Sequence, residues 1–220
     1  MKKNKINQEN IIEVIMNESS VFELKVEWWA FFISILALFF TLLKDYIIPF
    51  LIRPKMVFYY DNRPPYKRDF IQYNLGSGYC YGDFFRIEVK NIGSSTAKNC
   101  RCQIYDVLNL TSSQQVDLAG YTLKWASRPD FSERLEIHNS EREFIDIVFT
   151  KYNGDEVYLP TYHKIAVGMN GVLKKGKYQV ILLFTGDNFS PYEITIIINN
   201  LGIGNQLGLH LDKVVKLEKY

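Results

Sequence analysis

The chain has 220 residues, a net charge of +2 and an aromatic content of 15%. Such a balanced charge gives no electrostatic reason to bind nucleic acid, so nucleic acid is not an expected partner. The 3 cysteines, Cys80, Cys100 and Cys102, are too few and odd in number for a disulfide framework, and they are compatible with a reducing compartment. The aromatic content favours β-structure, because aromatic side chains suit a pleated, half-buried surface.

Residues 1–26 are expected to form an N-terminal tail. Apolar residues within the segment 10–18 recur at helical spacing. Two structures would explain this spacing: a short amphipathic helix on a membrane surface, or a partly ordered terminus. Ser20 followed by Glu23 has the spacing of a capping box and would start the next helix.

Residues 27–52 predict one transmembrane helix. Between Trp28 and Leu43 only Ser34 and Thr41 are not apolar, and no residue is charged. This core spans roughly 24 Å, and extension to residue 52 gives roughly 38 Å, against a hydrocarbon layer about 30 Å thick. A signal peptide is disfavoured because the run begins late, is long and lacks a small-residue cleavage site. A buried core helix is disfavoured because the apolar run is unbroken. The side chains expected to span the membrane are Trp28, Trp29, Phe31, Phe32, Ile35, Leu36, Phe39, Phe40 and Leu43.

Basic residues flank the helix unequally. The N-terminal side carries lysines at 2, 3, 5 and 25, whereas the C-terminal side carries lysine or arginine at 44, 53, 55, 63, 67 and 68. The positive-inside rule therefore predicts a single-pass membrane protein with its large domain in the cytoplasm and its short N-terminal tail outside. The candidate lipid or ligand contacts are Arg53, Lys55, Arg63, Lys67 and Arg68. Nucleic acid or nucleotide binding and a plain solvated loop are the other interpretations of this basic, tyrosine-containing stretch.

Residues 53–220 predict one β-sandwich domain. Alternating polar and apolar residues indicate strands at 56–60, 84–90, 97–107, 121–126, 144–150, 156–159, 178–184 and 193–198. Asn153-Gly154 predicts a hairpin turn, residues 61–82 are typical of a long loop, and residues 209–220 fit a helix or a strand. Residues 111–141 form an extra middle segment whose place in the sheet pattern the sequence does not predict. Because strand follows strand without a long helix, the expected class is mainly β with an antiparallel sandwich or barrel.

Two stretches resemble bacterial immunoglobulin-like domains. Residues 84–107 combine an alternating strand with Asn91-x-Gly93 and then Ala97-x-Asn99, and residues 172–199 place Gly176-Lys177-Tyr178 before a strand and Gly186-Asp187-Asn188 after it. The arrangement is similar to uncharacterised single-span bacterial membrane proteins with an immunoglobulin-like (CARDB-like) β-sandwich, some of which belong to defence or stress loci. The resemblance implies an antiparallel immunoglobulin-like sandwich behind one transmembrane helix in the bacterial inner (cell) membrane, and it brings no ligand or active site with it.

The cysteines and histidines do not predict a metal site. Cys100 and Cys102 would lie on one face of a strand, but zinc needs four ligands and no partner motif is present. Two buried core residues explain this pair better. His138, His163 and His210 lack the spacing of metal ligands.

No other motif predicts catalysis or a cofactor. Gly202-x-Gly204 lacks the lysine and the strand-to-helix context of a phosphate loop. Trp125, which precedes Arg128-Pro129-Asp130, fits a core tryptophan followed by a turn better than a functional rim. We therefore expect no catalytic, cofactor-binding or metal-ligating residue and no cofactor.

The expected function is that of a membrane-anchored, non-enzymatic interaction or sensing module, part of a bacterial defence (antiviral) or stress system. Its expected partners are the lipid bilayer and either another protein or further copies of the chain. One alternative is a defence effector whose transmembrane helix oligomerises and disrupts the membrane. A second alternative is an extracytoplasmic adhesion or cell-envelope binding domain, since the fold does not determine the side of the membrane.

Overall fold

The computed structural model describes residues 28–48, 52–74, 78–128, 132–152, 154–162, 172–202 and 207–218. The chain divides into two compact units, Met1–Ile52 and Arg53–Tyr220, which are described separately. Some predictions lie outside the described residues: those for the tail 1–26, for Pro129-Asp130, for His163 and for Gly204.

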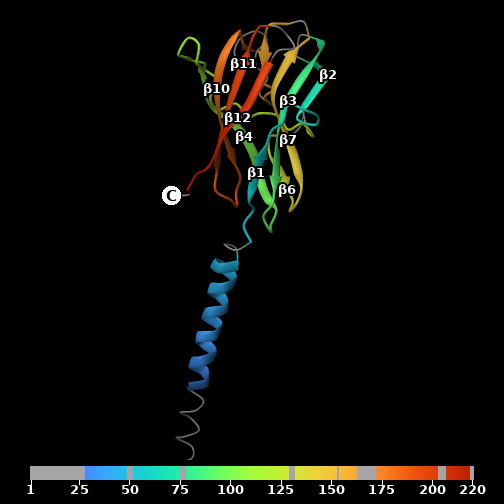
Figure 1. Ribbon diagram of the computed structural model, residues 1–220. Coiled ribbons are helices and arrows are strands. Elements are labelled where there is room, and N and C mark those ends of the chain that lie inside the picture. The colour runs from blue at the N-terminus through green and yellow to red at the C-terminus, as the bar shows by residue number, and fades with distance from the viewer. Residues whose placement is uncertain are drawn as a thin grey trace, which may run out of the picture. The chain divides into compact units, whose positions relative to one another are not determined.

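One apolar helix, Trp28–Ile47, forms the described part of the first unit (Figure 1). It is 20 residues long, and its length and composition suffice to cross a membrane, a test that a signal sequence near the N-terminus also passes. The hydroxyl groups of Ser34 and Thr41 donate hydrogen bonds of 2.8 and 2.9 Å to the carbonyl oxygens one turn before them. Both hydroxyls are thus satisfied within the helix, as an apolar environment requires. The helix ends in a π-helical turn, η1 (Leu43–Ile47).

The second unit is mainly β and consists of two antiparallel sheets, which confirms the predicted fold class (Figure 1). The first sheet contains β1 (Met56–Tyr59), β2 (Lys67–Asn74), β3 (Tyr79–Asn91), β7 (Arg142–Lys151), β8 (Val157–Tyr158) and β9 (Val172–Leu173). The second sheet contains β4 (Ala97–Asn109), β5 (Gln114–Gln115), β6 (Leu135–Ile137), β10 (Gly176–Thr185), β11 (Tyr192–Asn200) and β12 (Leu207–Lys216). β1 and β2 both pair with β3, and β5 and β6 both pair with β4.

The core lies between the two sheets and is built from residues that alternate along the strands. Ile87 and Val89 of β3 face Ile104 of β4 and Val180 of β10 in one buried cluster. β7 is buried on both faces, because Phe149 turns outward and packs against Phe84 with 4.9 Å between ring centroids. Simple alternation predicts Ile145, Ile147 and Phe149 on one face, but an irregularity in the pairing with β3 brings Val148 into the core and turns Phe149 outward.

Residues 121–128 join the two sheets, and we call them the bridging segment. On one side the amide of Leu123 donates a 2.9 Å hydrogen bond to the carbonyl of Cys102 in β4. On the other side the amide of Ala126 donates to the carbonyl of Phe144 in β7, at 2.8 Å. The prediction of a regular strand at 121–126 is wrong, because this segment divides its backbone hydrogen bonds between two sheets and forms only isolated bridges.

The structure corrects or completes three other predictions. The segment 61–82 is not one long loop, since it contains β2 and the start of β3. The ambiguous C-terminal stretch is the strand β12, paired with β11. Within 111–141 the structure places β5, β6 and the bridging segment. The predicted return strand is confirmed, because β7 and β8 pair with Phe149 opposite Tyr158, whereas Asn153 of the predicted turn lies outside the described residues.

Candidate functional site

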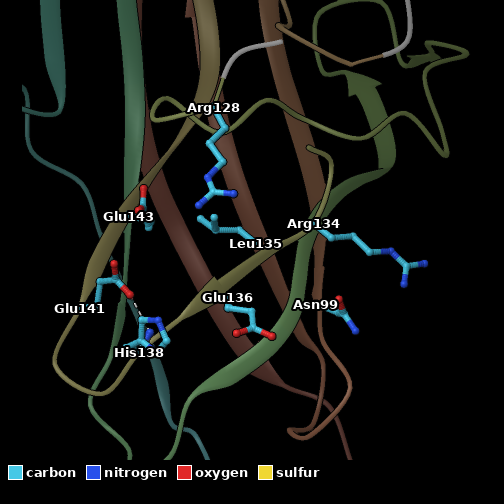
Figure 2. A pocket seen from close by; sticks show the side chains of 8 residues that line it. All are labelled: Asn99, Arg128, Arg134, Leu135, Glu136, His138, Glu141 and Glu143. Carbon is cyan, nitrogen blue, oxygen red and sulfur yellow. Dashed lines mark hydrogen bonds between the residues drawn. The ribbon is translucent and has the colours of Figure 1, made fainter. Parts of the chain in front are cut away.

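A cavity of about 350 Å³ opens beside β6, where the bridging segment turns toward β7 (Figure 2). Its lining combines side chains from β4, from β6 and the residue before it, from the following turn, from the start of β7 and from the end of the bridging segment. The lining residues are Asn99, Arg128, Arg134, Leu135, Glu136, His138, Glu141 and Glu143. Three carboxylates and two guanidinium groups therefore surround one small volume.

Trp125, which is completely buried, contacts the chain just before the cavity-lining strand β6. Its indole Nε1 donates a 3.3 Å hydrogen bond to the carbonyl of Glu133, just before β6. Its ring meets Phe184 of β10 edge to face, at 6.2 Å between centroids. Residues 135 and 137 of β6 point into the core, so Glu136 between them must point outward. The structure thus confirms Trp125 as a core residue followed by a turn.

Some of the lining groups already have partners. The Glu143 carboxylate accepts a 2.7 Å hydrogen bond from the hydroxyl of Ser127. The Glu141 carboxylate accepts one of 2.7 Å from the backbone amide of His138, drawn as a dashed line in Figure 2. The ring Nδ1 of His138 lies 3.1 Å from the hydroxyl of Thr96. These contacts fix the wall of the cavity nearest the start of β7.

Three charged side chains of the lining have no hydrogen bond or ion pair within the described part of the chain: Arg128, Arg134 and Glu136. In Figure 2 the guanidinium group of Arg128 points into the cavity, while that of Arg134 points away from it. A guanidinium group binds carboxylate or phosphate through two parallel hydrogen bonds. The cavity therefore offers a cation from Arg128 and an anion from Glu136 to a ligand that carries both charges.

The lining provides charged recognition groups but no hydroxyl, thiol or amine side chain that could act as a nucleophile. Among the described residues there is also no group of three or more His, Cys, Asp or Glu side chains placed to hold a metal ion. The charged side chains of the lining can bind a partner by ion pairs.

The predicted membrane-spanning residues all lie on the helix Trp28–Ile47, and no part of its apolar window is buried. The five predicted lipid or ligand contacts do not form one patch. Arg53 and Lys55 precede β1, whereas Lys67 lies opposite Phe85, six residues along β3 from the Met56–Asn91 pair. Six residues of strand correspond to about 20 Å. Lys67 also pairs with Asp69 at 3.2 Å, and the side chains of Arg63 and Arg68 are exposed.

Cys100 and Cys102 are buried core residues with free thiols, as the sequence predicts. Burial raises the pKa of the Cys100 thiol to about 12, and burial also raises the pKa of Cys102. Both thiols are therefore protonated near neutral pH and unreactive.

A buried ion pair lies on the outer face of the first sheet, and the sequence does not predict it. The guanidinium of Arg86 donates a 2.5 Å hydrogen bond to the carboxylate of Asp146. Burial raises the pKa of Asp146 to about 6, because desolvation outweighs the lowering effect of Arg86 and of Lys124. The pair links β3 to β7, where Arg86 and Asp146 lie opposite each other.

Comparison with known proteins returns no relative. No family model matches the chain, and neither a curated protein nor a solved structure matches it.

Proposed function

We propose that this protein is a membrane-anchored, non-enzymatic recognition module. The helix Trp28–Ile47 holds the β-sandwich at a lipid bilayer, and the cavity beside β6 binds a charged group of a partner. The partner is another protein or a second copy of the chain, and it presents an anionic group to Arg128 and a cationic group to Glu136.

The observation that carries the proposal is the exposure of the apolar helix, no part of whose apolar window is buried. Its large side chains are exposed by 44% at Leu42 to 70% at Tyr46, apart from the half-buried Leu43. Burying a large apolar side chain gains about 1.5–3 kcal/mol. Even half of this gain, summed over the nine predicted spanning side chains, amounts to about 10 kcal/mol, which favours transfer of the helix into a bilayer. A soluble monomer rarely leaves an apolar surface of this kind in water.

The proposal places the β-sandwich in the cytoplasm, because the positive-inside rule favours retention of the flank that contains Lys44, Arg53 and Lys55. The three cysteines support this side of the membrane, since all of them are free. A domain folded in an oxidising compartment more often pairs its cysteines.

Membrane fractionation tests the anchor. The full-length chain is expected to remain in the membrane pellet after extraction with alkaline carbonate and to keep its full mass. The double substitution Leu36→Arg, Phe39→Arg should release it, because each arginine at the centre of a span costs about 2.5–3.5 kcal/mol. The control is Tyr105→Arg, at a position 62% exposed on β4, which should stay in the pellet. Recovery of the unaltered chain in the soluble fraction, or as a shorter product cleaved after the apolar run, would overturn the proposal.

A further inference from the structure

The outer face of the first sheet, the side turned away from the core, carries more cations than carboxylates. Ile87 and Val89 of β3 belong to the core, so the residues that alternate with them, and the residues paired opposite those, point outward. Among the described residues this face holds six cations: Arg68, Arg86, Lys90, Lys124, Arg142 and Lys151. It holds two carboxylates, Glu88 and Asp146. We propose that the outer face is a docking surface for an acidic segment of a partner protein.

Both carboxylates of the outer face are buried and already have partners. The side chain of Asp146 is 6% exposed and accepts a hydrogen bond from the guanidinium of Arg86. Glu88 is 5% exposed, and its carboxylate accepts a 2.9 Å hydrogen bond from the hydroxyl of Tyr66. These two carboxylates therefore lie within the face and do not neutralise the cations that reach its surface.

Three cations gather at the centre of the outer face. Burial raises the pKa of Asp146, whereas Arg86, Lys124 and Arg68 all lower it, so three positive charges act on this one carboxyl group. Lys124 reaches this place from the bridging segment, which runs beside β7: the amide of Asp146 donates a 2.9 Å hydrogen bond to its carbonyl. The Nζ of Lys124 lies 5.7 Å from the ring centroid of Tyr73, so its side chain extends across the face toward β2.

Two further cations lie directly opposite each other on neighbouring strands. Lys90 of β3 pairs with Arg142 of β7. Within the described part of the chain neither side chain makes a hydrogen bond or an ion pair. Side chains that lie opposite each other in a sheet are about 5 Å apart, and like charges at this distance destabilise the pairing. An anionic group bound between Lys90 and Arg142 would remove this repulsion, as a docking surface for carboxylates requires.

The margin of the outer face does not cancel the excess of cations. In the adjoining turns and strand ends, the described residues include five cations and six carboxylates. The cations are Lys55, Arg63, Lys67, Arg128 and Lys174, and the carboxylates are Asp61, Asp69, Glu133, Glu141, Asp155 and Glu156. Glu143 belongs to the other face of β7, since it pairs with the core residue Val89. With the margin included, there are eleven cations and eight carboxylates.

The spread of the cations decides the size of the anion. Lys151 pairs with Gly82, which lies eight residues along β3 from Lys90. Eight residues of strand correspond to about 26 Å. A single phosphate or carboxylate cannot contact both ends of such a surface, so the occupant has to be an extended chain with several negative charges.

The aromatic side chains of the outer face favour an acidic polypeptide over single-stranded nucleic acid. Bases stack on the free faces of aromatic rings when a protein binds a single strand. On this face the rings nearest the central cations are covered by them. The guanidinium of Arg86 lies 5.3 Å from the ring centroid of Phe84, and the Nζ of Lys124 lies over the ring of Tyr73. Cations placed in this way present positive charge to a partner, whereas the rings offer no free face to a base.

A synthetic acidic peptide tests the inference with the full-length chain in neutral detergent micelles. The probe is a fluorescein-labelled peptide of alternating glutamate and serine, long enough to span the face, and its fluorescence anisotropy reports binding. We expect the glutamate peptide to bind and the same peptide with glutamine in place of glutamate not to bind. Binding should weaken several-fold between ionic strengths of about 0.01 and 0.15 M, because the Debye length falls from about 30 to about 8 Å.

A single charge reversal locates the binding surface. Lys90→Glu should weaken binding of the glutamate peptide about tenfold, which corresponds to about 1.4 kcal/mol. This variant should keep its thermal unfolding temperature, because it replaces two like charges opposite each other with an opposite-charge pair. Lys151→Glu, at the other end of the face, should also weaken binding. The matched control is Lys177→Glu, which makes the same change of charge at an exposed position of β10 in the second sheet and should bind within twofold of the unaltered chain.

Three results would overturn the inference. The first is failure of the unaltered chain to bind the glutamate peptide. The second is equal affinity of Lys90→Glu and Lys177→Glu for it. The third is tighter binding of an oligothymidylate of the same length that Lys90→Glu weakens, which would assign the face to nucleic acid. None of the charged residues within the face lines the cavity beside β6, so each of these results leaves the proposed function standing.

Discussion

Replacement of Asn91 should destabilise the β-sandwich more than replacement of any exposed asparagine. Its side chain is fully buried and makes four hydrogen bonds. It donates to the carbonyls of Ser95 and Ile137 at 2.7 and 3.0 Å, and it accepts from the amides of Gly93 and Lys55 at 3.0 and 3.3 Å. At about 0.5–1.5 kcal/mol each, with less for the longest, Asn91→Ala should lower the free energy of unfolding by about 3 kcal/mol.

Urea unfolding of the full-length chain in detergent micelles measures this loss. Replacing Trp28 and Trp29 with phenylalanine leaves the buried Trp125 as the only fluorescent tryptophan. Asn199→Ala is the control, because Asn199 is exposed on β11 and should cost less than about 0.5 kcal/mol. If Asn91→Ala and Asn199→Ala unfold at the same urea concentration, Asn91 does not hold the segments together as described.

Three further predictions concern charge, the cavity and topology. The pKa of Asp146 is about 6 in the folded chain and about 3.9 in the unfolded chain. The folded state therefore binds this proton more tightly, which stabilises the fold fully below about pH 4, and this stabilisation is lost as the pH rises through 6. From pH 4 to 7 the unfolding free energy should therefore fall by about 2–3 kcal/mol relative to Asp146→Asn, and parallel pH profiles would contradict this. Arg128→Ala and Glu136→Ala should each change stability by less than about 0.5 kcal/mol, whereas a larger shift in thermal unfolding would reveal a structural role. Tyr79→Cys, at a site 74% exposed, should react in a Cys80→Ser background with a membrane-impermeant maleimide only in broken cells, and labelling of intact cells would place the domain outside.

The sequence predicts those parts of the fold whose pattern is local. The apolar helix, the hairpin between β7 and β8, and the alternation that buries Cys100 and Cys102 all follow from neighbours within a few residues. β2 escapes prediction because a bulge between Arg68 and Ile71 interrupts its alternation. Phe70 within the bulge has a positive φ of 55°, a backbone conformation that no simple strand pattern anticipates.

The candidate site could not be predicted because its geometry depends on pairings between distant segments. Asn99 meets Glu136 only because β6 pairs with β4. The alternation of Leu135, Glu136 and Ile137 was the one local signal, and it is too short to distinguish a strand from a loop. The ion pair of Arg86 and Asp146 joins residues 60 positions apart, which no spacing rule detects. The immunoglobulin-like topology and the membrane contacts stay predictions.

The bridging segment has a consequence for self-association. Because it closes one side of the sandwich, the long unpaired backbone edges gather on the other side, along β12 and β2. Each of these strands is interrupted by a bulge and carries exposed charges, Asp212 and Lys213 on β12 and Arg68 and Asp69 on β2. Such edges resist the addition of a further strand. Copies of this chain should therefore not join sheet to sheet into fibres, and any assembly they form has to use side chains or the apolar helix.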